Sequence, residues 1–278
     1  MGLPADANRS ERSSAVTADP QALFTRDGPL LVPTEASLGP WRPDALHGGA
    51  VSALLGHSLA EDGWQLARVT MDLLRRVPLQ PLRLTVSATT NSRRVSRREA
   101  ELWAGDQLVA RAAALLLPES RVALPPQPDR RLEFPASTEP QSSDDVRAAI
   151  AERIGYTSFV SHAVDTRNAR RKDGYGERVY WLKLLLPVIA GEAITAIQRV
   201  TAAADYANGG FPSLPFEKWS FMSLDLTVQL TREPHGEWIA VTSDSLAAAT
   251  GIGLGDAELH DVNGRIGRAV ATLLVEPR

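Results

Sequence analysis

The sequence predicts an α+β fold of two similar units in tandem, each an antiparallel sheet wrapped around one long helix. The first observation is an internal repeat, because Ala100-Glu101-Leu102 followed by Arg111 recurs as Ala257-Glu258-Leu259 followed by Arg268. Leucine and arginine are nine residues apart in both copies, and an apolar run follows each arginine. The second observation is that each half holds one helical pattern followed by several strand patterns. Two copies of one unit can bury a shared surface and form a site between them.

A further pair of similar segments lies upstream of these copies. Thr70-Met71-Asp72-Leu73 is similar to Ser223-Leu224-Asp225-Leu226, at an offset of 153 residues, whereas the downstream copies are offset by 157. We expect a small loop insertion in the second copy to account for the difference.

The first unit is expected to contain one main helix and then a series of strands. Apolar residues within 49–61 recur at helical intervals, and no proline interrupts them. Residues 82–89 alternate strictly between apolar and polar, which predicts a strand. Two further strand-like runs, 99–103 and 108–117, flank a turn containing Gly105, so we expect them to form a hairpin.

A polar, proline-rich stretch over 118–147 shows no sustained periodicity and is expected to link the two units, 20–117 and 148–278. It is long for a loop inside a compact domain, and this length suits a connection that crosses from one unit to the next.

The second unit repeats the order of helix and strands. An alanine-rich helix is expected over 193–206, ending before Gly209 and Gly210. Residues 222–231 alternate between apolar and polar, which predicts a strand with Ser223 on its polar face. Three more strands are expected, over 238–244, 256–260 and 266–275.

Composition and charge exclude several classes of function. The 278 residues are 44% hydrophobic and 23% charged, as in an ordinary globular protein. A net charge of −3 gives no electrostatic reason to expect a nucleic-acid partner. The absence of cysteine excludes disulfides, thiolate metal ligands and a cysteine nucleophile, and we expect no metal site.

The first residues do not resemble a targeting or membrane segment. Residues 1–19 are polar, and no part of the chain approaches the ~20 apolar residues of a membrane helix. We therefore expect a flexible N-terminal tail, a cytoplasmic location and no membrane partner. Whether the chain assembles into a homo-oligomer is left open.

An ordered set of short motifs covers roughly residues 20 to 275. They are His47-Gly48-Gly49, Ala204-Asp205, Ser223-Leu224-Asp225-Leu226-Thr227, Gly236-Glu237-Trp238, and Leu259-His260-Asp261 with Gly264. In this set the chain resembles the double-hotdog acyl-CoA thioesterases of the thioesterase II type. The resemblance implies a tandem hotdog fold and an acyl-CoA substrate. Coenzyme A would then be part of the substrate, and no separate cofactor is expected.

The resemblance also implies a set of catalytic residues. In this family a thioester lies beside a helix N-terminus, and an Asp, a Thr or Ser, and a Gln position water for hydrolysis. Asp205 matches the Asp, and Ser223 matches the Thr or Ser. The Gln has no match, because its position falls on Ala271 or Thr272, and we assign this catalytic position to Thr272.

The residues themselves allow both a functional and a structural interpretation of the first helix start. Gly48 and Gly49 have no side chains, so a thioester carbonyl could approach bare amides where the helix dipole is positive. Alternatively, the sequence His-Gly-Gly is only a tight turn that enters a packed helix. We expect His47, Gly48 and Gly49 to bind substrate, with His47 in a structural or phosphate-side role.

Asp205 and Ser223 have the same two interpretations. A carboxylate near a helix C-terminus is electrostatically disfavoured, and burial would raise its pKa towards that of a useful general base. Alternatively, Asp205 is exposed in a fraying last turn, and Ser223 belongs to a solvated sheet face. The chain has no Gly-x-Ser-x-Gly nucleophile motif, so we expect direct attack by water.

Two basic clusters are candidates for contact with the phosphates of coenzyme A, although such runs are usually solvated turns. They comprise Arg93, Arg94, Arg97 and Arg98, and Arg167, Arg170, Arg171 and Lys172. The favoured function is acyl-CoA hydrolysis. The alternatives are a non-hydrolytic acyl-thioester binding protein, suggested by the missing Gln, and an enoyl-CoA hydratase, disfavoured because no His follows Asp205 before His235.

Overall fold

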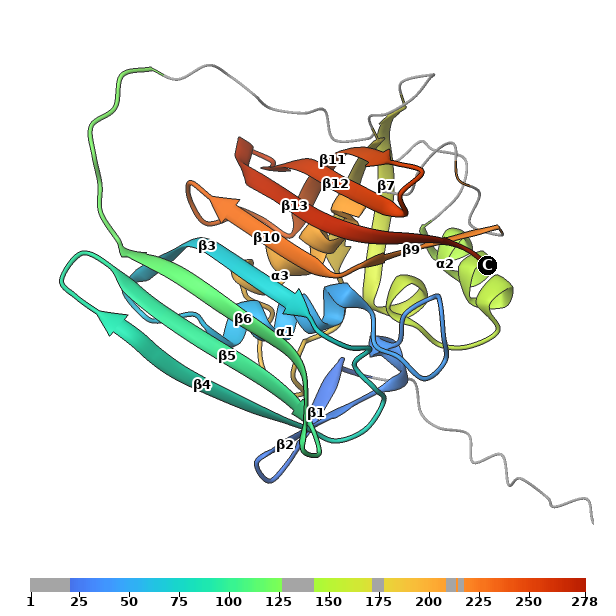
Figure 1. Cartoon of the computed structure of the whole chain (residues 1–278). Coiled ribbons are helices and arrows are strands. Elements are labelled where there is room, and N and C mark those ends of the chain that lie inside the picture. Colours follow the sequence, from blue (N-terminus) through green and yellow to red (C-terminus); the bar gives the residue numbers. More distant parts are fainter. Residues whose placement is uncertain (1–20, 127–142, 172–177, 209–213, 215–217) are drawn as a thin grey trace, which may run out of the picture.

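The computed structural model describes residues 21–126, 143–171, 178–208, 214 and 218–278. The predicted tail over 1–19 and residues 127–142 of the predicted linker lie outside this part of the chain. The described strands form one large antiparallel sheet in the order β1-β2-β4-β5-β6-β3-β10-β13-β12-β11-β8-β7, with β9 also paired to β13 (Figure 1).

The elements follow one another along the chain in two halves. The first half contains β1 (Phe24–Asp27), β2 (Leu30–Pro33), the 3-10 turn η1 (Glu35–Ser37), α1 (Gly48–Ser58), β3 (Trp64–Leu73), β4 (Leu82–Asn91), β5 (Ser96–Ala104) and β6 (Gln107–Pro118). The second half contains α2 (Ser143–Ile154), the π-helical turn η2 (Phe159–Ala163), β7 (Val164–Arg171), β8 (Arg178–Leu184), α3 (Ala196–Ala204), the 3-10 turn η3 (Asp205–Asn208), β9 (Trp219–Ser223), β10 (Asp225–Leu230), β11 (Trp238–Ala247), β12 (Ile252–Asp261) and β13 (Gly264–Pro277).

Both predicted main helices are present, as α1 and as α3 continued by η3. The predicted strands are present too, whereas β1, β2, β3, β7, β8 and helix α2 were not predicted. The helix α2 begins at Ser143, so the last residues of the stretch predicted as a linker are helical. The missed strands β1 and β7 are the two edges of the sheet, where one side of a strand has no partner and charged residues are common.

The internal repeat is visible in the register of the sheet. Ala100 pairs with Ala112 and Glu101 with Arg111 between β5 and β6, and the residues 157 positions later pair in the same way between β12 and β13. The register shift that follows Leu102 recurs after Leu259, again 157 positions later. The two halves of the sheet therefore share one hydrogen-bonding pattern.

The expected change of offset from 157 to 153 is wrong. Asp72 pairs with Arg111, and Gln229 pairs with Arg268, so the counterpart of Asp72 is Gln229 rather than Asp225. Thr70 pairs with its own counterpart Thr227 across β3 and β10, as a twofold relation requires. The N-caps of the two main helices are only 148 residues apart, whereas the strands that follow them are 157 apart. The insertion in the second copy therefore lies between its main helix and the strands that follow.

The predicted strand over 222–231 is interrupted at Leu224, where β9 ends and β10 begins. Ser223 pairs with Leu273 and Thr227 with Val270, so the pairing to β13 shifts by one residue between them. This shift reverses which residues face the helices. Ser223 lines a cavity together with Phe221, Met222 and Leu224, whereas it was expected on the polar face of a continuous strand.

Both main helices lie on one side of the sheet, behind β3 and β10 in Figure 1. The start of α1 lies against the end of α3, because a Cβ on Gly48 would touch the Asp205 carboxylate. Further along α1, Gly56 lies against Thr201 of α3. Of the helices in the described residues, none has the length and apolar character needed to cross a bilayer.

Candidate active site

The N-terminus of α1 is held by the side chain of its N-cap, His47. The Nδ1 atom of His47 accepts a hydrogen bond from the Gly49 amide at 2.9 Å. Its ring stacks on Phe159 of η2, with the centroids 4.6 Å apart. The Gly48 amide has no hydrogen-bond partner among the described residues, and Gly48 lines a cavity. The helix start therefore presents one unpaired amide donor to that cavity.

Asp205 lies against the start of α1, beside Gly48. It follows the last residue of α3, is 5% exposed, and its Oδ2 lies 3.2 Å from Nδ1 of His47. A Cβ on Gly48 would lie 2.5–2.8 Å from the Asp205 carboxyl atoms. Gly48 is therefore needed at this position because the carboxyl group of Asp205 occupies the space of a side chain.

Burial shifts the pKa values of this pair in opposite directions. Removal from water raises the pKa of Asp205, while His47, the Gly49 amide and the Ser223 hydroxyl lower it. Burial also lowers the pKa of His47, and the charge of Asp205 opposes that effect. While Nδ1 of His47 accepts from the Gly49 amide, it carries no proton and cannot donate to the Asp205 carboxylate.

Ser223 and Asn208 complete the polar wall beside Asp205. The Ser223 hydroxyl lines the cavity beside the Asp205 carboxyl group and lowers the pKa of that group. The Asn208 amide donates to Oγ of Ser223 at 3.4 Å, so a carboxylate, a hydroxyl and an amide follow one another. Asn208 was overlooked in the sequence because the Asn-Gly-Gly pattern was interpreted only as a helix end. Its position three residues after Asp205, within one turn, is the signal that could have found it.

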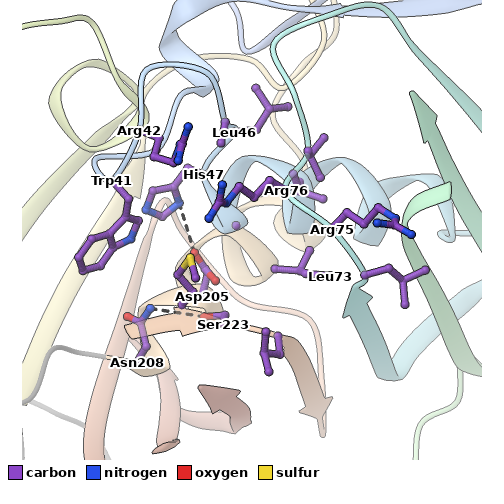
Figure 2. A pocket seen from close by; sticks show the side chains of 18 of the residues that line it. Trp41, Arg42, Leu46, His47, Leu73, Arg75, Arg76, Asp205, Asn208 and Ser223 are labelled. Carbon is purple, nitrogen blue, oxygen red and sulfur yellow. Dashed lines mark hydrogen bonds and ion pairs between the residues drawn. The ribbon is translucent and has the colours of Figure 1, made fainter. Parts of the chain in front are cut away.

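These groups line a cavity of about 220 Å³ between the start of α1 and the end of α3 (Figure 2). Figure 2 shows His47 and Asp205 joined by a dashed line, with Ser223 and Asn208 beneath them. Much of the remaining wall is apolar: Trp41, Leu46, Val51, Leu73, Leu74, Val77, Phe221, Met222 and Leu224. Three arginines, Arg42, Arg75 and Arg76, also line it.

Two of the residues predicted for the site are not part of this cavity. Gly49 is buried, and a Cβ there would lie 3.0 Å from both the Ala202 carbonyl oxygen and Phe159, so its lack of a side chain serves helix packing. Thr272 is exposed, and its amide and hydroxyl both donate to Asp225. Alternate residues of β13 face the helices, which turns the side chain of Thr272 away from the cavity.

The described side chains of the two basic clusters do not line the cavity either. Arg98 donates to the Ala60 carbonyl oxygen at 2.6 Å, and Arg167 lies over the ring of Trp238. Arg93 and Arg94 are exposed in the β4–β5 turn. Lys172 and the side chains of Arg170 and Arg171 lie outside the described part of the chain.

The cavity joins three chemical functions at one place. A buried carboxylate with a raised pKa can accept a proton, a hydroxyl and an amide can orient a water molecule, and a free helix amide can stabilise an oxyanion. Within the described residues, no cluster of three or more His, Asp or Glu side chains could hold a metal ion. The arrangement suits attack by water on a polarised carbonyl group.

Comparison with known proteins gives family matches over most of the chain. A family model described as the acyl-CoA thioesterase N-terminal domain matches residues 38–117, and one described as the acyl-CoA thioesterase C-terminal domain matches residues 128–275. A comparison with curated protein sequences found no match.

Solved structures with low sequence identity share the fold. The TesB protein of Mycobacterium avium subspecies paratuberculosis is 14% identical, with a TM-score of 0.63 over 91% of this chain and 96% of that one. The acyl-CoA thioesterase II TesB2 of Mycobacterium marinum is 14% identical, with a TM-score of 0.62 over 83% and 89%. A hot dog fold protein from Alicyclobacillus acidocaldarius is 12% identical, with a TM-score of 0.62 over 92% and 95%.

Proposed function

Because the chain belongs to the acyl-CoA thioesterase family, we propose that it hydrolyses acyl-CoA thioesters in the cavity between α1 and α3. We take each half of the sheet with its main helix as one hotdog unit, so that the active site lies between two units in tandem. The observation that carries the proposal is the buried Asp205 carboxyl group, which lies against Gly48 at the start of α1 and is flanked by Ser223 and Asn208.

In the proposed reaction the thioester carbonyl oxygen accepts a hydrogen bond from the Gly48 amide. The amide lies at a helix N-terminus, where the peptide dipoles favour negative charge, so the interaction strengthens as the oxygen becomes an oxyanion. The acyl group occupies the apolar wall, and the sulfur and its carrier extend towards solvent.

Asp205 acts as the general base for a water molecule that attacks the carbonyl carbon. The water transfers a proton to Asp205 as its oxygen forms the new bond, and the tetrahedral intermediate then breaks the carbon–sulfur bond. The departing thiolate takes the proton from Asp205, which restores the carboxylate. The raised pKa of Asp205 makes it a stronger base than an ordinary carboxylate.

Ser223 and Asn208 are proposed to orient this water. The resemblance implies an amide from the last strand, but Thr272 is exposed and hydrogen-bonded to Asp225. The Asn208 amide, three residues after Asp205 and bonded to Ser223, supports an alternative source for the same donor. The amide would then come from the end of the second helix rather than from β13.

The proposal is tested by measuring free thiol release from a panel of acyl-CoA thioesters of increasing chain length. We expect turnover by the wild type and severe loss in Asp205→Asn, which retains the shape of the side chain without its base. Binding of acyl-CoA by the wild type without thiol release would instead indicate a binding protein.

The contact between His47 and Asp205 favours hydration of enoyl-CoA as a second candidate. That chemistry needs an Asp and a His held together near the helix, and the His need not follow Asp205 in the sequence. His47 precedes Asp205 by 158 residues yet lies 3.2 Å from it. Loss of the conjugated enoyl absorbance without thiol release would identify this reaction.

A further inference from the structure

The mouth of the cavity is positively charged although the protein as a whole carries a net charge of −3. Arg42, Arg75 and Arg76 line the cavity, and all three side chains are exposed. Arg42 lies in the loop before α1, and Arg75 and Arg76 lie just after β3, so two separate segments bring cations to the same opening.

Within the described residues, Asp44 is the one carboxylate that forms an ion pair with these arginines. Asp44 accepts hydrogen bonds from Nε and Nη2 of Arg42 at 2.9 and 3.1 Å. Arg42 lowers the pKa of Asp44, and the charge of Arg76 adds to that effect. No ion pair forms on the side chain of Arg75 or Arg76 within the described residues. The cluster of three arginines and Asp44 thus retains an excess of positive charge.

A fourth cation adjoins the same opening. The guanidinium of Arg278 lies over the ring of Trp41, 4.8 Å from its centroid, and Trp41 lines the cavity beside Arg42. In Figure 2 the side chains of Arg42 and Arg76 lie near His47 at one side of the cavity, whereas Arg75 extends away from it. The opening therefore combines several guanidinium groups with an aromatic wall.

We propose that Arg42, Arg75 and Arg76 bind the phosphate groups of coenzyme A and position the thioester over Asp205. This inference rests on the proposed function. Guanidinium groups match phosphate oxygens in geometry and charge, and the uncleaved thioester has no carboxylate that could compete for them. Among the parts of the substrate, the coenzyme A carrier supplies the phosphates, far from the reacting carbonyl.

The test compares one acyl group on two carriers, coenzyme A and the phosphate-free N-acetylcysteamine. We expect Arg76→Ala to lower kcat/KM for the coenzyme A thioester by about tenfold, as for loss of a charged hydrogen bond, through KM. The N-acetylcysteamine thioester should react at an unchanged rate. Arg42→Ala should also lower kcat/KM for the coenzyme A thioester. Added salt should lower kcat/KM of the wild type towards the values of the variants.

Arg94→Ala is the matched control, because Arg94 is exposed but lies in the β4–β5 turn. It should leave kcat/KM unchanged with both thioesters. An equal loss with both carriers in Arg76→Ala, or a loss specific to coenzyme A in Arg94→Ala, would overturn the proposal. So would faster turnover of an acyl group on acyl carrier protein than on coenzyme A.

Calorimetry with free coenzyme A separates this inference from the proposed function. If the wild type releases no thiol from either thioester, the proposed hydrolysis is wrong. Binding of coenzyme A to the phosphate site can still be measured in that case. Coenzyme A should then bind the wild type about tenfold more tightly than Arg76→Ala, and pantetheine should bind both alike. Equal binding of coenzyme A to both proteins would overturn the phosphate site.

Discussion

At one end of the α1–α3 pair a glycine-rich helix start faces a buried carboxylate, whereas at the other end a helix start is closed by its own side chains. The first end has His47 as N-cap and Gly48 in contact with Asp205. At the second, Thr195 accepts from the Gln198 amide, and the Gln198 side chain accepts from the Thr195 amide. A capping box of this kind occupies the amides that a ligand would otherwise use.

The two ends occupy related positions in the repeat. The N-caps His47 and Thr195 are 148 residues apart, and the same offset relates His57 to Asp205. The side chain of His57 is 30% exposed and lies 3.6 Å from Glu192, whereas Asp205 is 5% exposed. Under the proposed function, the duplicated helix pair carries out chemistry at one end only, where small residues leave room for a buried acid.

Asp205→Asn should give the largest effect and would remove the chemical difference between the two ends. Loss of the general base is expected to lower kcat by about 100- to 10,000-fold, with less change in KM. Both kcat and KM are measured by steady-state kinetics of thiol release. Retention of wild-type kcat would show that the carboxylate does not take part in the reaction.

The same variant should be more stable than the wild type at neutral pH. The folded-state pKa of Asp205 is raised by burial, so the stability gained from its protonated form is lost as pH rises through that value. Asparagine does not ionise and keeps that stability. We expect a higher Tm for Asp205→Asn at pH 7 and a smaller difference near pH 4, measured by thermal unfolding.

Gly48→Ala should lower kcat by displacing the Asp205 carboxyl group. The added Cβ would overlap the Asp205 carboxylate, and a misplacement of ~1 Å in a catalytic group can lower the rate about 100-fold. Gly56→Ala is the matched control, because its Cβ would press on Thr201 within the helix pair instead. It should alter the Tm while kcat is kept. Equal loss of kcat in both variants would assign the effect to helix packing.

The sequence predicted both main helices and the strands β4, β5, β6 and β10 to β13, because their periodicity is regular and turn residues lie between them, but it missed the central strand β3. It could not predict the face on which Ser223 lies, because the register shift at Leu224 depends on pairing with β13 rather than on local alternation. The same limitation affected Thr272, whose orientation follows from its place in β13. Local sequence patterns do not encode such registers.

The environment of each glycine was equally inaccessible from the sequence. Gly48 and Gly49 looked interchangeable as bare amides, but one faces Asp205 and the other faces Ala202 and Phe159. His47 and Asp205 are 158 residues apart, so no motif search joins them. The arginines at the cavity mouth were missed because they are scattered, whereas the basic clusters that stood out lie elsewhere.

Ser223→Ala should have a moderate effect on the active end. A lost neutral hydrogen bond corresponds to about a 2- to 12-fold fall in kcat/KM. The Ser223 hydroxyl lowers the pKa of Asp205, so its removal should raise that pKa. Because only ionised Asp205 acts as a base, the acid limb of the pH profile of kcat/KM should move to higher pH. If the acid limb stayed at the same pH, the Ser223 hydroxyl would not influence the ionisation of Asp205.

Thr195→Ala tests the closed end and should have the smallest effect on catalysis. Loss of the N-cap hydroxyl removes one hydrogen bond from the Gln198 amide and should lower the free energy of unfolding by about 1 kcal/mol. In a chain of this size that corresponds to a fall in Tm of roughly 2–4 °C. Because Thr195 does not line the cavity, kcat/KM should be unchanged.

The matched variant at the active end is His47→Ala, which removes both an N-cap and the partner of Asp205. It should lower the Tm and kcat together, whereas Thr195→Ala should lower the Tm alone. If Thr195→Ala lowered kcat as much as His47→Ala, both helix starts would contribute to catalysis. The division into one reactive and one structural end depends on these two N-cap variants behaving differently.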